Sequence, residues 1–105
     1  MSDNELKMLW EMRRNNKIKW TIHSFKRIRE RKISADSVVD TVLNGQIVEH
    51  YSDDKPFPSY LIFNDDMIFP LHVVASACDE FVYIITAYVP STDEWEYDYK
   101  NRKEQ

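Results

Sequence analysis

The hydrophobic pattern of the chain changes its period at Gly45–Gln46. Before this point apolar residues recur every three or four positions, which is the spacing of an amphipathic helix. After it, the apolar runs are rich in β-branched and aromatic residues, which favour strands. At 105 residues the chain has room for one core. The sequence therefore predicts a single α+β domain over residues 1–105, with its helices first and its sheet second.

Three helices are expected in the first half. The first covers residues 3–15, and the second runs from Thr21 or His23 to Lys32, with Phe25 and Ile28 on its inner side. The third is capped by Ser34 and ends at Asn44–Gly45. Because Gly45 is the one glycine of the chain, it is predicted to take the left-handed conformation that ends many helices.

Four strands are expected in the second half, at residues 47–51, 59–63, 71–78 and 81–89. Short polar turns separate them, so the sheet is predicted to be mostly antiparallel. Pro90 ends the last strand, and a short C-terminal helix should follow with Trp95 and Tyr99 on its inner face. The predicted fold is thus a set of N-terminal helices packed on a mostly antiparallel four-stranded sheet, with a short C-terminal helix.

Composition indicates a folded protein of the cytoplasm. Hydrophobic residues make up 43% and aromatic residues 13% of the chain, which is more than a disordered chain contains. No run approaches the roughly 18 apolar residues of a membrane span, and the first residues lack the order of a secretory signal. Cys78 has no second cysteine to pair with, so it is expected to be a small buried apolar residue.

Charge is distributed unevenly along the chain. Residues 1–33 hold ten Lys and Arg against four Asp and Glu, whereas residues 34–105 hold four against fourteen. A basic segment of this density can bind a phosphate backbone. It can equally fold back on the acidic half, and the sequence leaves both interpretations open.

The basic segment contains a ladder of side chains spaced four residues apart. His23, Arg27 and Arg31 fall on one face of the second predicted helix, with Lys26 beside them. Each guanidinium offers planar paired donors to phosphate oxygens, and an imidazole can transfer a proton near neutral pH. The alternatives are a solvated face, or pairing with Glu49, Asp53 or Asp54 of the acidic half.

Further candidates lie on the predicted strands and their loops. His72 falls in an apolar run, where it is either a hydrogen-bonded core residue or a general acid or base. Tyr60, Tyr83 and Tyr88 can stack on bases or complete the core. Lys55, in a polar loop, can reach a phosphate or remain solvated. The His and Cys residues lack metal-ligand spacing, so neither a metal nor a cofactor is expected.

Seven short motifs also occur in order along the chain. They are Thr21-x-His23, Arg27-x3-Arg31, Asn44-Gly45, Tyr51 with Asp53-Asp54-Lys55-Pro56, Pro70-Leu71-His72-Val73-Val74, Ile85-Thr86-Ala87-Tyr88-x-Pro90, and Trp95. In this order they resemble the uncharacterised prokaryotic domain family numbered 4258, which is similar in architecture to RelE-type and BrnT-type toxins of toxin–antitoxin systems. The resemblance covers about residues 20–103, which leaves residues 1–19 as an N-terminal helical extension. The chain departs from the family before Pro70 and at Asp79–Glu80, where it lacks glycine.

The resemblance implies either a toxin that cleaves RNA or a relative that has lost this activity, with a small DNA-binding antitoxin as its partner. We therefore expect a metal-independent endoribonuclease acting on mRNA, in which the RNA 2′-hydroxyl attacks the adjacent phosphate. Arg27 and Arg31 would hold the phosphate, His23 or His72 would transfer a proton, and Tyr88 or Tyr60 would position a base, with Lys26 and Lys55 contacting RNA. The competing hypotheses are a non-catalytic interaction or nucleic-acid-binding module, and a purely structural role for the ladder. A homo-oligomer is compatible with each of these.

Overall fold

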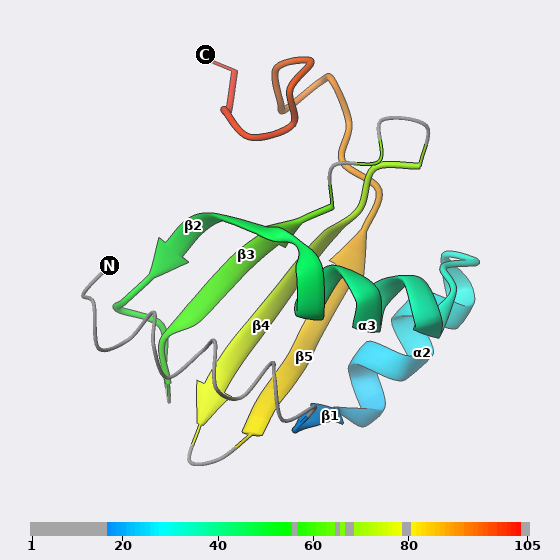
Figure 1. Cartoon of the computed structure of the whole chain (residues 1–105), viewed down its shortest axis with the longest axis vertical. Helices are drawn as coiled ribbons and strands as arrows, with labels where there is room; N and C mark the ends of the chain where they lie inside the picture. The colour runs from blue at the N-terminus through cyan, green and yellow to red at the C-terminus, as the bar shows by residue number, and fades with distance from the viewer. Residues whose placement is uncertain (1–16, 56, 65, 67–68, 79–80, 104–105) are drawn as a thin grey trace.

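The computed structural model describes residues 17–55, 57–64, 66, 69–78 and 81–103. The predicted helix at residues 3–15 lies outside these ranges. In chain order the elements are β1 (Ile18–Trp20), α2 (Ile22–Glu30), α3 (Ala35–Asn44), β2 (Gln46–Tyr51), β3 (Ser59–Phe63), β4 (His72–Cys78) and β5 (Phe81–Tyr88) (Figure 1). The second and third predicted helices and the four predicted strands agree with the structure to within about two residues. No helix in these described ranges is long and apolar enough to cross a membrane.

The described residues form a sheet of five strands in the order β1-β5-β4-β3-β2, so the prediction of four strands was wrong. The strands β2 to β5 pair antiparallel with their neighbours, whereas β1 pairs parallel with β5, from Ile18 opposite Val82 to Trp20 opposite Ile84. The sheet is therefore mixed. β1 escaped prediction because its three residues are too few to establish an alternating pattern. It also crosses the predicted boundary between residues 19 and 20.

The predicted C-terminal helix is wrong as well. Residues 91–103 form a series of turns closed by an antiparallel bridge between Trp95 and Arg102. The carboxylate of Asp98 accepts hydrogen bonds from the backbone amides of Lys100 and Asn101, at 2.9 and 3.2 Å. This local bonding competes with helical bonding, and Tyr99 adopts a left-handed φ of 57°. We call residues 91–103 the C-terminal segment.

Side-chain caps fix the start of both helices. At α2 the Thr21 hydroxyl accepts the amide of Ser24, and the Ser24 hydroxyl accepts the amide of Thr21, both at 3.0 Å. This reciprocal pair satisfies two amides that would otherwise lack partners. At α3 the Ser34 hydroxyl accepts the amide of Ser37.

Gly45 is required for a different reason from the one predicted. Its φ is −73°, so the glycine is not left-handed. A Cβ at this position would lie 2.4 Å from the carbonyl oxygen of Thr41 and 2.8 Å from Ile62 Cγ2. The glycine therefore permits the end of α3 to approach β3 closely, and the left-handed residue after α2 is Lys32.

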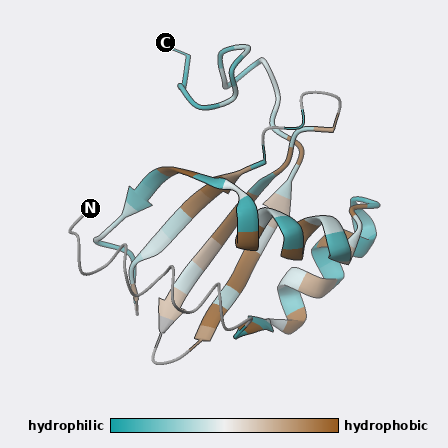
Figure 2. Ribbon diagram, viewed as in Figure 1, coloured by the Kyte–Doolittle hydropathy of each residue, from teal (hydrophilic) through white to brown (hydrophobic). Residues whose placement is uncertain are grey.

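Both helices pack on the same face of the sheet, where α2 contacts β5 and α3 contacts β4 and β3 (Figure 1). The core on this face joins Ile28, Val38 and Val42 of the helices to alternate strand residues such as Val73 and Ile84. Figure 2 shows the apolar residues gathered on the strands and on the inner sides of the helices. Phe25, predicted to face inward, is 46% exposed and lies edge-on to Trp20. We call the opposite side of the sheet the far face.

Candidate functional site

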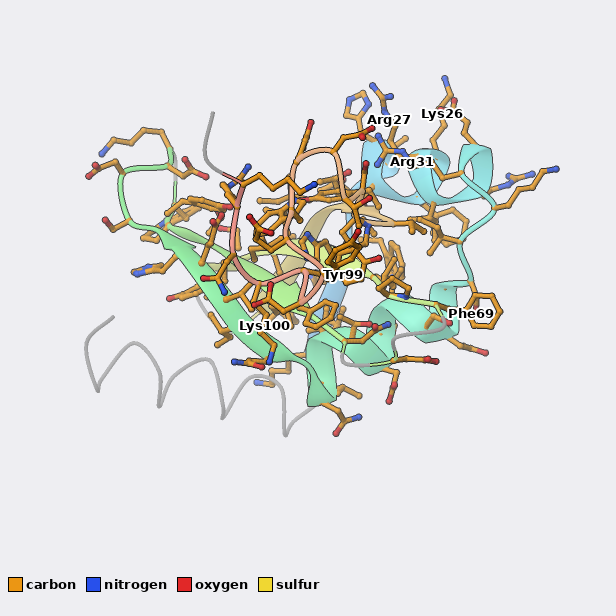
Figure 3. All side chains as sticks on the ribbon, turned by 90° about the horizontal axis from the view of Figure 1, so that it is seen from above. Lys26, Arg27, Arg31, Phe69, Tyr99 and Lys100 are labelled. Atoms are coloured by element: carbon orange, nitrogen blue, oxygen red, sulfur yellow. The ribbon has the colours of Figure 1, made fainter. Side chains whose placement is uncertain are left out.

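The basic ladder lies on the surface of α2. His23, Lys26, Arg27 and Arg31 are all exposed, and Lys26, Arg27 and Arg31 lie together at one side of the molecule (Figure 3). In the part of the chain that the structure describes, two of the three predicted acidic partners, Glu49 and Asp54, bond to other residues. Glu49 pairs with Arg102, and Asp54 accepts a hydrogen bond from Ser59. The ladder therefore keeps cations available to an anionic ligand.

Arg31 connects this ladder to the sheet. Its Nη1 donates to the carbonyl oxygen of Ala87 at 2.7 Å and to Thr86 Oγ1 at 3.2 Å. Pairing of β1 with β5 stops at Ile84, so among the described residues no strand lies beside the edge of β5 beyond this point. The guanidinium of Arg31 fills that place and satisfies an edge carbonyl. Within the described residues its other N–H groups make no hydrogen bond, so they can bind a ligand at the same edge.

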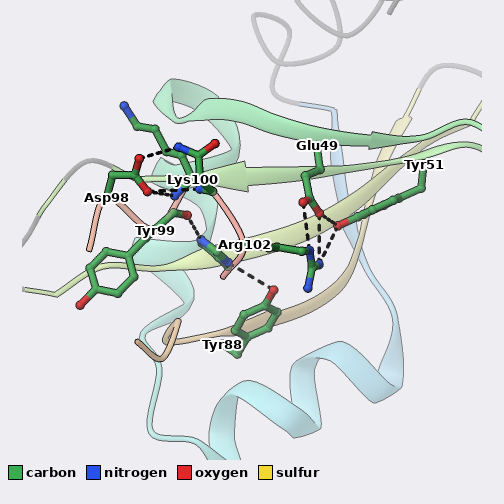
Figure 4. Close-up of polar contacts among 9 residues, drawn as sticks. Glu49, Tyr51, Tyr88, Asp98, Tyr99, Lys100 and Arg102 are labelled. Atoms are coloured by element: carbon green, nitrogen blue, oxygen red, sulfur yellow. Dashed lines mark hydrogen bonds and ion pairs between the residues drawn. The ribbon is translucent and has the colours of Figure 1, made fainter. Parts of the chain in front are cut away.

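His72 and Tyr88 form a pair on the far face. They lie directly opposite one another on β4 and β5, and His72 Nδ1 is 3.2 Å from the Tyr88 hydroxyl. His72 Nε2 is 2.8 Å from the backbone carbonyl oxygen of Tyr99 (Figure 4). A carbonyl can only accept, so Nε2 carries the proton. In the neutral ring Nδ1 then accepts from Tyr88.

The C-terminal segment covers this pair. His72 is 0% exposed, and its ring lies edge-on to the indole of Trp95, with 4.6 Å between the centroids. Trp95 is itself buried, whereas Tyr88 is half-buried. Any ligand therefore reaches the imidazole through the Tyr88 phenol and not directly.

Burial controls the protonation of both groups. Loss of solvent lowers the pKa of His72 below its ordinary value, and this outweighs the hydrogen bond to Tyr99, which acts in the opposite direction. Burial likewise raises the pKa of Tyr88. Near neutral pH the pair thus consists of an uncharged imidazole and an uncharged phenol, which is the state in which the ring can accept a proton.

An ion pair between Arg102 and Glu49 holds the C-terminal segment on the sheet. This pair was not predicted from the sequence. Arg102 donates to Glu49 Oε2 at 3.0 Å and to Oε1 at 3.1 Å, and its guanidinium carbon lies 4.5 Å from the centre of the Trp95 ring. The Tyr51 hydroxyl also donates to Glu49 (Figure 4). The only sequence signal was the spacing of Glu49 and Tyr51, two residues apart on one strand face.

The same contacts shift three pKa values. Burial raises the pKa of Glu49, but the hydrogen bonds from Arg102 and Tyr51 prevail and hold it below its ordinary value. Burial and the neighbouring carboxylate raise the pKa of Tyr51 to about 12. The hydrogen bond to Glu49 raises the pKa of Arg102. The pair therefore stays ionised across the physiological range.

Tyr60 and Lys55, both predicted to contact RNA, lie apart from the His72–Tyr88 pair. Tyr60 is 3% exposed in the helix-side core, and its ring stacks on His50 at 4.7 Å. It therefore offers no free ring face to a base, and the predicted stacking role does not fit this position. Lys55 is exposed in the loop between β2 and β3. Among the described residues, no three His, Cys, Asp or Glu side chains gather as a metal site.

The fold and this site define a small mixed-sheet domain with two helices on one face and a covered histidine–tyrosine pair on the other. The chain belongs to the family described as Domain of unknown function (DUF4258), whose profile matches residues 20–89. This confirms the family predicted from the motifs, whereas similarity to RelE-type or BrnT-type toxins is not shown. No curated protein and no solved structure matches the chain. The matched region includes the ladder, His72 and Tyr88, and it ends before the C-terminal segment.

Proposed function

We propose that the protein is the toxin of a toxin–antitoxin pair, and that it binds and cleaves mRNA in the cytoplasm without a metal ion. The observation that carries the proposal is the position of Arg31, which extends from the basic ladder of α2 to Thr86 and Ala87, beside Tyr88 and its partner His72. A phosphate-binding cation and a proton-accepting pair are thereby brought to one end of β5.

The ladder contributes phosphate binding. Arg27 lies one helical turn from Arg31, so the two guanidiniums can hold neighbouring phosphates of a single strand. His23 lies eight residues from Arg31, which corresponds to about 12 Å along a helix. This separation excludes His23 from the phosphate that Arg31 holds. Of the two imidazoles considered as proton carriers, His72 is therefore the one assigned to the reaction.

The cleavage step uses Tyr88 as the contact with RNA. The 2′-oxygen forms a bond to phosphorus and the bond to the 5′-oxygen breaks. The 2′-hydroxyl proton passes to the Tyr88 oxygen while the Tyr88 proton passes to Nδ1 of His72, and the 5′-oxygen takes a proton from water. Arg31 stabilises the charge that develops on the phosphate. The lowered pKa of His72 keeps its ring able to accept this proton at neutral pH.

One observation favours the alternative of RNA binding without cleavage. The ring of His72 is fully buried and both of its nitrogens have partners, which is also the arrangement of a structural core histidine. In that case the ladder would bind RNA and no product would form.

The two functions are separated by incubating the protein with a mixed-sequence RNA in EDTA and following both binding and cleavage. We expect cleavage by the unaltered chain, and we expect Arg27→Ala to weaken binding and to reduce the dependence of log Kd on log salt by about 0.7. Lys100→Ala is the matched control, because Lys100 is an exposed cation that lies away from the ladder (Figure 3). Salt-dependent binding without product would establish the alternative. Absence of binding would contradict both.

The same proposal includes an antitoxin as the protein partner. Ile22 is 86% exposed and Phe25 is 46% exposed, and both border Lys26 and Arg29 on α2. An apolar patch edged by cations fits an acidic segment with apolar anchors. Inducible expression in a bacterium should arrest growth, and co-expression of the neighbouring reading frame should relieve the arrest. Unchanged growth under induction would argue against the toxin assignment.

A further inference from the structure

A cavity of about 360 Å³ opens on the far face, where the loop between β2 and β3 meets β5. Its walls include Lys55 and Phe57 of the loop, Ser76 of β4, and Tyr83 and Ile85 of β5. The volume lies within the range of about 300–1,000 Å³ that is usual for small-ligand sites. No pattern in the sequence predicts a cavity at these residues.

Strand geometry explains why the walls face this way. Val82 and Ile84 are buried in the helix-side core, so Tyr83 between them points to the far face, opposite Ser76. The register then shifts between Val74 and Ala75, which inserts Ile85 as an extra residue in β5. Such a bulge re-aims the side chains that follow it. Ala87 consequently returns to the core, while Thr86 and Tyr88 face the far side, opposite Val74 and His72.

The loop is tied down over β4. Ser76 Oγ donates to the carbonyl oxygen of Pro58 at 2.9 Å, and the Ser59 hydroxyl donates to Asp54 Oδ2 at 2.5 Å. These bonds hold the two ends of the stretch that carries Lys55 and Phe57. Phe57 nevertheless remains 43% exposed, and Ile85 remains 42% exposed. The cavity is thus a formed site whose apolar walls are open to a ligand.

We propose that this cavity binds a nucleobase of the RNA strand, stacked on Phe57 and Tyr83, with an adjoining phosphate on Lys55. Aromatic rings bind any base through its π-face, and a cation beside them fits the attached phosphate. Lys55 is exposed and pairs with no carboxylate within the described ranges, so its charge is available. Asp54 and Thr21 complete the walls, and the Asp54 carboxylate accepts the Ser59 hydroxyl. The walls therefore match an uncharged planar ring whose attached anion lies on the Lys55 side of the cavity.

The position of the cavity places that base near the proposed cleavage point. Ile85 precedes Thr86, the residue that accepts a hydrogen bond from Arg31. From Ile85 to Tyr88 the strand advances about 10 Å. A single strand laid along β5 can therefore put a base in the cavity and a nearby phosphate at Arg31. This inference rests on the proposed RNA-binding function and adds to it the subsite that selects the base.

The test uses an RNA trinucleotide whose 2′-hydroxyls are methylated, so that it cannot be cleaved, and a matching trinucleotide with one base removed. Affinities are measured by titration, with the backbone amide signals of Lys55, Phe57 and residues 83–85 followed by NMR. We expect loss of the base to weaken binding about tenfold, and Phe57→Ala to weaken the intact trinucleotide by a similar factor. The abasic trinucleotide should bind Phe57→Ala and the unaltered chain equally, because the base and the ring act as one contact.

Phe69→Ala is the matched control, since Phe69 is a 76% exposed phenylalanine outside the cavity. Equal effects of the two substitutions, or equal effects of Phe57→Ala on the intact and abasic trinucleotides, would overturn the subsite. Metal-independent cleavage that persists in that case would leave the proposed function standing. Conversely, base-dependent binding at Phe57 without any cleavage of unmodified RNA would support the subsite and contradict the proposed reaction. The nucleobase subsite would also be overturned if a phenylalanyl peptide displaced the trinucleotide and its affinity did not change in Lys55→Ala.

Discussion

The Tyr88 hydroxyl and His72 Nδ1 lie 3.2 Å apart across β4 and β5, and the same imidazole reaches the carbonyl oxygen of Tyr99 from its other nitrogen. One buried ring thus joins two strands of the sheet to the C-terminal segment. Because its polar atoms are all satisfied, the free energy of unfolding should depend on this ring in a way that no exposed residue of the ladder does.

Replacement of His72 by phenylalanine keeps an aromatic ring of similar size and leaves the Tyr99 carbonyl without its donor. We expect a loss of about 1–3 kcal/mol in the free energy of unfolding, measured by urea denaturation. The control is His23→Ala, which should change stability by less than about 0.5 kcal/mol because His23 is exposed. Similar values for the two variants would show that the His72 contacts add nothing to stability.

Stability should also depend on pH through His72. Its pKa is lowered from the ordinary value of 6.5 in the folded chain, so below pH 6.5 the unfolded chain binds this proton more readily than the folded one. The stabilisation is therefore complete above pH 6.5 and is lost as the pH falls through the lowered folded pKa. Thermal unfolding between pH 7.5 and 5 should show this decline, and His72→Phe should flatten it. An unchanged slope in that variant would assign the decline to other groups.

Substitution of Arg31 and of Arg27 should have different effects on the stability of the protein but similar effects on RNA binding. Arg31→Ala removes two hydrogen bonds to β5 and should cost about 1 kcal/mol, whereas Arg27→Ala should be nearly neutral. Both substitutions should weaken binding of RNA and lower its salt dependence. Urea denaturation and salt titration of the two variants check these outcomes. A purely structural ladder would instead give two variants that bind RNA as tightly as the unaltered chain.

Gly45→Ala should destabilise the protein although the glycine has an ordinary φ. The added methyl group would overlap the Thr41 carbonyl, so α3 must move away from β3 at a cost of about 1–3 kcal/mol or more. Gln46→Ala, at the exposed neighbouring position, is the control. A stabilised Gly45→Ala variant, as expected where a glycine merely adds disorder to the unfolded chain, would contradict the close approach.

The parts of this fold that sequence predicts are those with a long regular pattern. The spacing of the valines in α3 and the long apolar runs of β4 and β5 are sufficient to identify each element. β1 has three residues, and its strand conformation depends on pairing with β5. No pattern within these three residues predicts that pairing. The turns at Asp98 arise because a side chain bonds to the local backbone in a stretch whose residues would otherwise suit a helix.

The candidate site was predictable in its parts and not in its arrangement. Spacing placed the ladder on one face of α2, and the apolar run around His72 indicated a hydrogen-bonded buried histidine as one of two interpretations, which the burial and both bonds of its ring match. Alternation could not show that Tyr60 and Tyr88 lie on opposite faces of the sheet, because all five residues of β3 are buried. Trp95 covers His72, and Glu49 pairs with Arg102. Both contacts join residues far apart in the chain, and the periodicity of a sequence does not reveal such contacts.

Single-turnover cleavage by Tyr88→Phe is the most direct test of the proposed reaction. This variant keeps the ring and removes the hydroxyl that would relay the proton to His72. Loss of the bond to the buried Nδ1 should lower the free energy of unfolding by about 1–3 kcal/mol, so the cleavage assay is run where urea denaturation shows the variant folded. RNA binding should stay close to that of the unaltered chain. With unmodified RNA in EDTA at pH 7.5, we predict a rate lowered by about 100-fold or more at unchanged Kd. Cleavage by Tyr88→Phe at the rate of the unaltered chain would contradict the assignment of Tyr88 and His72 as the proton-transfer pair.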